Sequence, residues 1–139
     1  MKMRDKFSKY IGIPFVDHGI TSEGCDCYGL VLLVYKEELG IDLPWLGDSY
    51  SHAYRRKDVN STVKKNIDLG CYIDVTNDPR KPLDIIIFRT GGLETHIGLW
   101  VEDGWLLDIL EGAHSTIRRY DTSEWKNRIT RILRHVDAR

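Results

Sequence analysis

The chain has 139 residues, of which 42% are hydrophobic and 29% are charged, and its formal net charge is −1. This size predicts one domain over residues 1–139, and the balanced charge argues against nucleic-acid binding, which needs a clearly basic surface. We expect no membrane span, because no apolar run is long enough, and no signal peptide, because residues 1–10 lack an apolar stretch. The three cysteines are an odd number, so we expect synthesis in a reducing cytoplasm.

The N-terminal half of the chain has the pattern of helices. A short amphipathic helix is expected over residues 4–11, and a second helix over residues 27–39. The second segment is apolar almost all round, which is typical of a helix buried at the centre of a domain. Asp26 is a good N-cap for it, and Gly40 is a good C-terminal stop. After a polar stretch, a further helix is expected around residues 56–66.

The C-terminal half has the pattern of strands from Cys71 onward. Strands are expected over residues 84–89, 96–101, 105–110, 116–120 and 128–136. The Glu-Asp-Gly sequence between the second and third of these is a strong hairpin signal. Helices first and strands second predict an α+β fold, with the N-terminal helices packed on a central antiparallel sheet of about five or six strands.

Cys27 is the candidate nucleophile. It lies where the first turn of the second helix should be, and the unpaired N–H groups and positive dipole end there favour a thiolate. A free cysteine is also commonly a small buried core residue. Its position alone therefore leaves both interpretations open.

His96 is the candidate base, although a lone histidine at the start of a strand is more often structural. The hairpin register decides whether Asp108 can orient it. If residues 103–104 form a two-residue turn, Asp108 points away from His96. If residues 102–104 form a three-residue loop with its glycine left-handed, Gly98 faces Asp108. His96 and Asp108 then lie diagonally on one face, with Cβ atoms roughly 7 Å apart or less, and the carboxylate can hold the imidazole tautomer.

Other candidates have weaker support. His114 is a second candidate for orienting His96, but it falls in the turn after the hairpin. Cys25 and Cys27 form a Cys-x-Cys pair, yet no second closely spaced ligand pair accompanies it. We therefore expect no metal site and no cofactor.

Several runs of this sequence together resemble the NlpC-type cell-wall peptidases, which are compact papain-like cysteine hydrolases. The matching runs are residues 11–16 (IGIPFV), 24–31 (GCDCYGLV), 34–35 (VY), 40–44 (GIDLP), 82–88 (PLDIIIF) and 96–100 (HIGLW). The likeness extends from about residue 9 to residue 109, and the combination of runs is specific.

The resemblance implies a catalytic triad of Cys27, His96 and Asp108. Such enzymes cleave the amide bond between D-γ-glutamyl and diaminopimelyl or lysyl residues of peptidoglycan stem peptides, through a thioester acyl-enzyme. The family pattern also places four residues at the substrate: Asp26, which matches an acid that binds the free amine of the stem, with Tyr28, Phe15 and His18. This sequence departs from the pattern at each of the last three, and at Asp108, where the family commonly has histidine.

The departures have consequences for the site. A tyrosine that assists the nucleophile in many members is Phe15 here, so the oxyanion must rely on backbone N–H groups. A Trp-Gly-Gly run is replaced by residues 17–19, with His18 at its centre, which reshapes one wall of the cleft. Tyr28 stands where a serine often follows the nucleophile.

Tyr28 and residues 125–134 look closer to the phage tail-assembly branch of the family. This implies a virion-tail location, action at the bacterial cell wall and phage tail proteins as partners. The alternative function is a structural tail-assembly protein whose catalysis is vestigial or dispensable. An acyltransferase or deamidase that uses the same thiol is a third.

Overall fold

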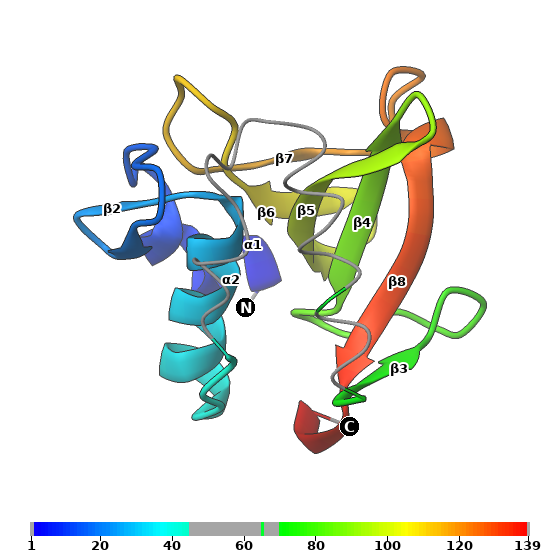
Figure 1. Cartoon of the computed structure of the whole chain (residues 1–139), viewed down its shortest axis with the longest axis horizontal. Helices are drawn as coiled ribbons and strands as arrows, with labels where there is room; N and C mark the ends of the chain where they lie inside the picture. The colour runs from blue at the N-terminus through cyan, green and yellow to red at the C-terminus, as the bar shows by residue number, and fades with distance from the viewer. Residues whose placement is uncertain (1, 45–64, 66–69, 139) are drawn as a thin grey trace.

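The computed structural model describes residues 2–44, 65 and 70–138, and its largest element is a six-stranded antiparallel sheet (Figure 1). In spatial order the strands are β3 (Tyr72–Asp74), β8 (Ile129–His135), β4 (Ile85–Thr90), β5 (Leu93–Glu102), β6 (Trp105–Asp108) and β7 (Thr116–Arg119). The predicted α+β fold is confirmed. The helix expected around residues 56–66 lies, except for Lys65, outside the described residues.

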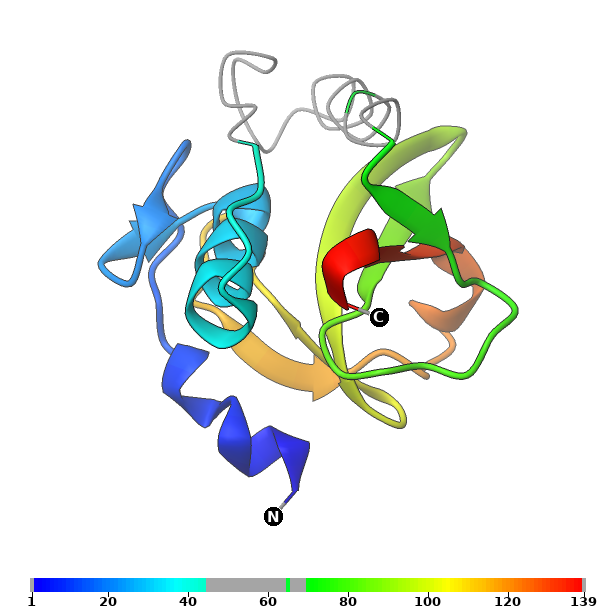
Figure 2. The ribbon, with the colours of Figure 1, turned by 90° about the horizontal axis from the view of Figure 1, so that it is seen from below.

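The helical part is small and comes first in the chain. The predicted N-terminal helix is present as α1 (Met3–Lys6) followed by a 3₁₀ turn (Ser8–Tyr10). The predicted central helix is present as α2 (Cys27–Val34), which continues as one π-helical turn (Tyr35–Leu39). Figure 2 shows α2 running alongside the sheet, and its residues contact β5. None of the helices in the described part of the chain is long and apolar enough to cross a membrane.

A two-stranded hairpin precedes α2, in a region where no strand is predicted from the sequence. It consists of β1 (Ile20–Thr21) and β2 (Gly24–Cys25). Each strand has two residues, too few for an alternating pattern to be recognised in the sequence. The hairpin delivers the chain directly to Asp26 and the start of α2.

Close backbone packing fixes the position of α2. A Cβ added to Gly29, in the first turn, would lie 1.7 Å from the carbonyl oxygen of Gly19, so only glycine fits there. At the other end of the helical segment Gly40 is left-handed, with φ 65°, and ends it as predicted. These contacts hold the N-terminus of α2 against the loop that precedes β1.

The core lies on both faces of the sheet, as strand alternation requires. On one face α2 packs its apolar side chains against the sheet; this cluster includes Leu30, Val34, Ile85, Ile87, Leu99 and Leu107. On the other face a second cluster includes Ile86, Phe88, Trp100, Leu106 and Ile132. The central strands therefore read as continuous apolar runs because both of their faces are covered.

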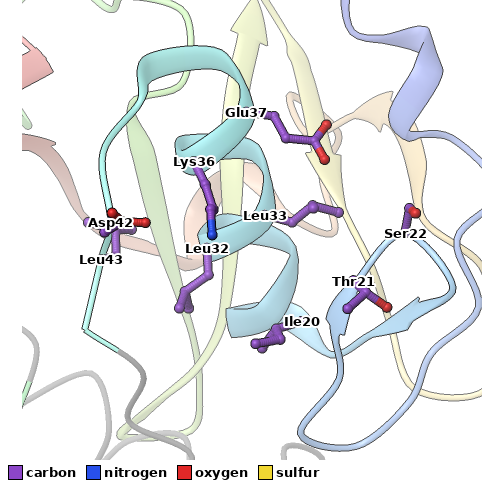
Figure 3. A pocket seen from close by; sticks show the side chains of 9 residues that line it. All are labelled: Ile20, Thr21, Ser22, Leu32, Leu33, Lys36, Glu37, Asp42 and Leu43. Carbon is purple, nitrogen blue, oxygen red and sulfur yellow. The ribbon is translucent and has the colours of Figure 1, made fainter.

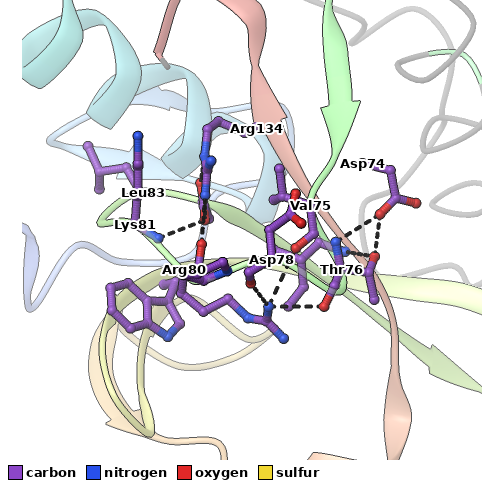
Figure 4. Close-up of polar contacts among 12 residues, drawn as sticks. Asp74, Val75, Thr76, Asp78, Arg80, Lys81, Leu83 and Arg134 are labelled. Atoms are coloured by element: carbon purple, nitrogen blue, oxygen red, sulfur yellow. Dashed lines mark hydrogen bonds and ion pairs between the residues drawn. The ribbon is translucent and has the colours of Figure 1, made fainter.

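A buried ion pair joins the start of β4 to the end of β8 (Figure 4). Arg134 donates from Nε to Oδ1 of Asp84 at 2.8 Å and from Nη2 to Oδ2 at 2.7 Å. The same Oδ2 accepts the backbone N–H of Lys81 at 2.8 Å. Between these residues Leu83 has a left-handed backbone, with φ 74°, and its carbonyl accepts the hydroxyl of Tyr35 at 2.7 Å. The segment that enters β4 is thus held by polar contacts on two sides.

Candidate active site

Cys27 is the first residue of α2, and only 4% of it is exposed. Asp26 caps the helix as predicted, because its Oδ1 accepts the N–H of Gly29 at 2.7 Å. Its Oδ2 accepts the N–H of His18 at 2.8 Å. Both carboxylate oxygens of this fully buried residue therefore hold the backbone around the nucleophile in place.

The environment of Cys27 favours the thiol over the thiolate. Burial raises the pKa of Cys27 above its ordinary value, and the carboxylates of Asp26 and Asp108 raise it further. The backbone N–H groups of Cys27 and Tyr28 lower the pKa, in the direction expected at a helix N-terminus. Burial is the larger effect, so the thiol is favoured overall, although the helix N-terminus acts in the predicted direction. A base must take the proton of Cys27 before its sulfur can attack.

His96 and Asp108 form a buried hydrogen bond of 2.7 Å between Nε2 and Oδ2. Burial alone would raise the pKa of Asp108, but hydrogen bonds from His96 and Arg118 outweigh burial and hold that pKa below its usual value. An ionised carboxylate can only accept, so Nε2 of His96 carries the proton. Nδ1 is then the ring nitrogen with a free lone pair, as a general base requires.

The β5–β6 turn is residues 103–104, because Glu102 pairs with Trp105, so the predicted three-residue loop is wrong; a register shift farther along β5 nevertheless places Gly98 opposite Asp108, as that loop would have done. The pairs of β5 and β6 are Leu99 with Leu107, Trp100 with Leu106 and, beside the turn, Glu102 with Trp105. The register shifts between the last two pairs, and Gly104 is left-handed, with φ 80°. Gly98 consequently lies opposite Asp108: an added Cβ would be 3.2 Å from Cβ of Asp108 and 2.4 Å from Cδ1 of Leu106. The missing side chain leaves room for Asp108 beside His96.

Two residues complete this cluster that the sequence did not assign to the site. Arg118, on β7, donates from Nε to Oδ1 of Asp108 at 2.9 Å and from Nη2 to Oδ2 at 2.5 Å. Its guanidinium lies 4.3 Å from the centre of the Trp125 ring. The centres of the Trp125 and His96 rings are 5.8 Å apart. The ring of Phe88 stacks on that of His96, also with 5.8 Å between the ring centres. Arg118 lies in β7, diagonal to Asp108, and no local sequence signal marks it as a site residue.

Cys27 approaches this cluster without a direct bond to it. Cys27 belongs to the core cluster on the α2 side of the sheet, whereas the His96 ring contacts Phe88 and Trp125 of the second cluster. Among the described contacts, no hydrogen bond joins Cys27 to His96. The charge of Asp108 contributes to the raised pKa of Cys27, as the smallest of its causes. Such catalytic hydrogen bonds are often long in a free enzyme and tighten when substrate binds.

The three remaining predicted binding residues gather around the start of α2. Phe15 is partly buried, and its backbone bridges to that of Cys25. His18 has a left-handed backbone, with φ 65°, which its N–H bond to Asp26 helps to hold. Tyr28 is buried in the core, with 6% exposed.

His114 does not take the orienting position in this structure. It is exposed, and its backbone bridges to Pro14 instead. The partner of His96 is Asp108. In the ranges that the structure describes, no group of three or more His, Cys, Asp and Glu side chains could hold a metal ion.

A separate cleft of about 790 Å³ opens beside α2 and the β1–β2 hairpin (Figure 3). It is lined by Ile20, Thr21, Ser22, Leu32, Leu33, Lys36, Glu37, Asp42 and Leu43. The lining combines apolar side chains with charges of both signs. It includes no residue that the sequence predicted for the site, so it gives no support to the catalytic assignment.

Comparisons with known proteins agree with the family resemblance. The model of the NlpC/P60 family matches residues 12–134. A gamma-DL-glutamyl hydrolase of Bacillus subtilis (strain 168) is 33% identical over 128 residues, which cover 91% of this chain and 27% of that protein. A murein DD-endopeptidase MepS/murein LD-carboxypeptidase of Escherichia coli (strain K12) is 21% identical over 134 residues, which cover 96% of this chain and 61% of that protein. The chain thus spans less than two thirds of the length of these relatives.

Solved structures show the same fold. The NlpC/p60 domain of peptidoglycan hydrolase SagA superposes with a TM-score of 0.59 at 20% identity, over 95% of each chain. An NlpC/P60 family protein from Bacillus cereus ATCC 10987 superposes with a TM-score of 0.66 at 18% identity, over 97% of this chain and 39% of that one. At this level of identity the likeness concerns the arrangement of helices and strands.

Proposed function

The chain belongs to the NlpC/P60 family, and on that premise we propose that it is a cysteine peptidase that hydrolyses amide bonds in peptidoglycan stem peptides. The observation that carries the proposal is the buried His96–Asp108 hydrogen bond, in a fold whose packed helix begins with Cys27. The names of two relatives, a murein endopeptidase and a gamma-DL-glutamyl hydrolase, support this substrate class. The finer proposal is cleavage between D-γ-glutamyl and diaminopimelyl or lysyl residues, by one domain over residues 1–139.

The proposed reaction uses Cys27 as nucleophile and His96 as base. Nδ1 of His96 takes the proton from Sγ of Cys27, and the sulfur forms a bond to the carbonyl carbon of the scissile amide. The tetrahedral intermediate breaks its C–N bond, and the amine leaves with the proton from His96. Water, deprotonated by the same nitrogen, then hydrolyses the thioester and restores the thiol. Because burial raises the pKa of Cys27, His96 must take this proton for the sulfur to attack.

The backbone at the start of α2 supplies the proposed oxyanion contacts. Phe15 has no hydroxyl to contribute, whereas the N–H groups of Cys27 and Tyr28 already act on the thiol. Fixed backbone donors stabilise the negative oxygen of a tetrahedral intermediate without reorganisation. Asp26 occupies the N–H of Gly29, which leaves the earlier groups of the helix for the substrate.

The experiment is a digest of defined stem peptides by the wild type, Cys27→Ala and Cys71→Ala, with products identified by mass spectrometry. The wild type and Cys71→Ala should release the same fragments, because Cys71 precedes β3, the edge strand farthest in the sheet order from β5 and β6. Cys27→Ala should release none while its circular dichroism matches that of the wild type. Cleavage by Cys27→Ala at the wild-type rate would overturn the proposal, and His96→Ala should also be inactive.

We further propose that the protein acts at the cell wall as part of a phage tail, with tail proteins as partners. This rests on the resemblance of Tyr28 and residues 125–134 to the tail-assembly branch. A second candidate function is a tail component whose catalysis is dispensable, and the burial of the Cys27 thiol favours it by suppressing the thiolate. Recovery of intact stem peptide after long incubation with the wild type, together with measurable binding, would support this second function over hydrolysis.

A further inference from the structure

Arg118 and Asp108 form a two-point ion pair directly behind His96. Nε of Arg118 bonds Oδ1 at 2.9 Å and Nη2 bonds Oδ2 at 2.5 Å, while Nε2 of His96 bonds the same Oδ2 at 2.7 Å. Only 1% of the Asp108 side chain and 22% of the Arg118 side chain are exposed. One carboxylate is therefore shared between an imidazole and a guanidinium, away from bulk solvent.

We infer that Arg118 is a positioning residue for the proposed peptidase. The ion pair of Arg118 with Asp108 makes the partner of His96 electrically neutral, and this neutral partner sets the proton affinity of His96. The inference rests on the proposed function for the role of His96 as base. It adds a residue on a third strand, β7, to the machinery. A positioning residue acts through another group, and Arg118 acts through Asp108.

The charge of Asp108 would be a problem for this base if it were unpaired. A carboxylate at hydrogen-bonding distance stabilises an imidazolium and raises the pKa of the histidine by about one to three units. A protonated imidazole cannot accept the proton of Cys27, so an unopposed carboxylate favours the form of His96 that is not a base. The proposed reaction needs a neutral imidazole, because His96 takes the proton of Cys27 in its first step. Arg118 supplies the opposing charge while leaving the carboxylate as an acceptor that holds the tautomer.

Aromatic packing fixes the guanidinium in this position. Arg118 lies 4.3 Å from the centre of the Trp125 ring, and the Trp125 ring is 5.8 Å from that of His96. Trp125 also meets Phe88 edge-on at 5.3 Å. His96 thus contacts Asp108, Asp108 contacts Arg118, Arg118 contacts Trp125, and Trp125 contacts His96. A planar guanidinium can bond a carboxylate at two points and stack on a ring at once, which lysine cannot do.

Other charged groups around His96 do not provide this balance. Cys27, on α2, is held neutral, and Asp26 before it acts on the thiol and is capped by backbone N–H groups. Arg128 lies 5.4 Å from the centre of the same Trp125 ring, and none of its described contacts is with Asp108. Arg118 is the cation in direct contact with the carboxylate.

The decisive measurement is the pKa of His96 by NMR titration of its imidazole, in the wild type, Arg118→Met, Asp108→Asn and the double variant. Arg118→Met should raise the His96 pKa by about one unit, because Asp108 is left unopposed. Asp108→Asn should lower it by a similar amount, because the cation is left unopposed. The double variant should return close to the wild type. His96→Gln identifies the signal among the five histidines.

A merely structural ion pair predicts a different result. Its loss would unfold or loosen the protein in both single variants, without opposite shifts of the His96 pKa. Two single variants that shift this pKa in the same direction, or leave it unchanged, overturn the inference. Arg118→Lys keeps the charge but not the two-point contact with Asp108, so it should keep the His96 pKa near the wild-type value. This variant also serves if Arg118→Met does not fold.

The activity arm is the pH profile of kcat/KM on a stem peptide. Arg118→Met should move the acidic limb to higher pH by the same amount as the NMR shift, and Arg118→Lys should leave the limb in place with a lower kcat. Arg119→Met, the next residue of β7, whose partner Asp121 is exposed, is the matched control and should leave the limb unchanged. If the wild type cleaves no stem peptide, the proposed function fails, whereas the NMR order still decides the role of Arg118.

Discussion

His96 on β5 and Asp108 on β6 lie diagonally across neighbouring strands, and their side chains meet in a buried hydrogen bond of 2.7 Å. The residue between them in space is Gly98, which presents no side chain to that face. The geometry of the proposed base thus depends on one missing Cβ as much as on the two polar groups. This dependence can be tested without altering any ionisable residue.

Gly98→Ala should damage both stability and activity. The new methyl would lie 2.4 Å from Cδ1 of Leu106 and 3.2 Å from Cβ of Asp108, so at least one of these buried residues must shift. Overpacking of this kind costs about 1–3 kcal/mol of unfolding free energy. A displaced Asp108 should also lower kcat by about tenfold or more, since small misplacements of catalytic groups are costly. Gly92→Ala is the control, because nothing lies within 4 Å of its added Cβ.

These effects are measured by urea unfolding and by steady-state hydrolysis of a stem peptide. If Gly98→Ala kept wild-type stability and wild-type kcat, the space left by Gly98 would not be needed to hold Asp108 beside His96.

Asp26→Asn separates the capping role of this residue from its predicted role in binding an amine. The amide can still accept from Gly29, but its NH₂ group would face the N–H of His18, which is also a donor. We expect a loss of about 1–2 kcal/mol of unfolding free energy from the damaged cap. Asp42→Asn, at an exposed carboxylate, should lose far less.

The kinetic readout is KM for a stem peptide with a free amine and for the same peptide acetylated. A residue that only caps α2 changes both KM values equally, because it misplaces Cys27 for either substrate. A selective rise in KM for the free amine would establish amine binding by Asp26.

The sequence predicts the elements whose signals are local. α2 follows from its apolar composition together with Asp26 and Gly40 at its ends, and both caps are present in the structure. The short β5–β6 connection with its left-handed glycine predicts that Gly98 faces Asp108, although the extra residue lies in β5 between Trp100 and Glu102 and not in the loop. Local rules therefore suffice to bring His96 and Asp108 together.

Features that depend on distant parts of the chain are not accessible in this way. Residues 109–115 between β6 and β7 are too long a connection for a turn type to specify the register, so the diagonal contact of Arg118 with Asp108 is not predictable from it. The raised pKa of Cys27 has the same origin, because burial comes from packing across the whole domain. A helix N-terminus in isolation favours the thiolate, and tertiary burial reverses the balance.

The Arg134–Asp84 ion pair should contribute strongly to stability. Its side chains are 10% and 2% exposed, and Asp84 also accepts the N–H of Lys81. Arg134→Met leaves a buried carboxylate without its cation, which costs about 3 kcal/mol or more. Arg119→Met, whose pair with Asp121 is about half exposed on both sides, should cost far less.

Thermal unfolding of the two variants and the wild type makes this comparison directly. Equal unfolding midpoints for Arg134→Met and Arg119→Met would contradict a strong contribution of the Arg134–Asp84 ion pair to stability.

The last prediction concerns stability in acid. Hydrogen bonds from His96 and Arg118 outweigh burial and place the pKa of Asp108 in the folded protein below its usual value, which is about 3.9 in an unfolded chain. A carboxyl group whose pKa is lower in the folded state stabilises the protein above the unfolded value, and this contribution is lost as the pH falls toward the folded value. Between about pH 5 and pH 3 the wild type should therefore lose more unfolding free energy than Asp108→Asn. Arg118→Met, which removes one of the two donors, should lie between them. Urea unfolding across this range measures the three slopes, and equal slopes for the wild type and Asp108→Asn would mean that the carboxylate is not held ionised by its two partners.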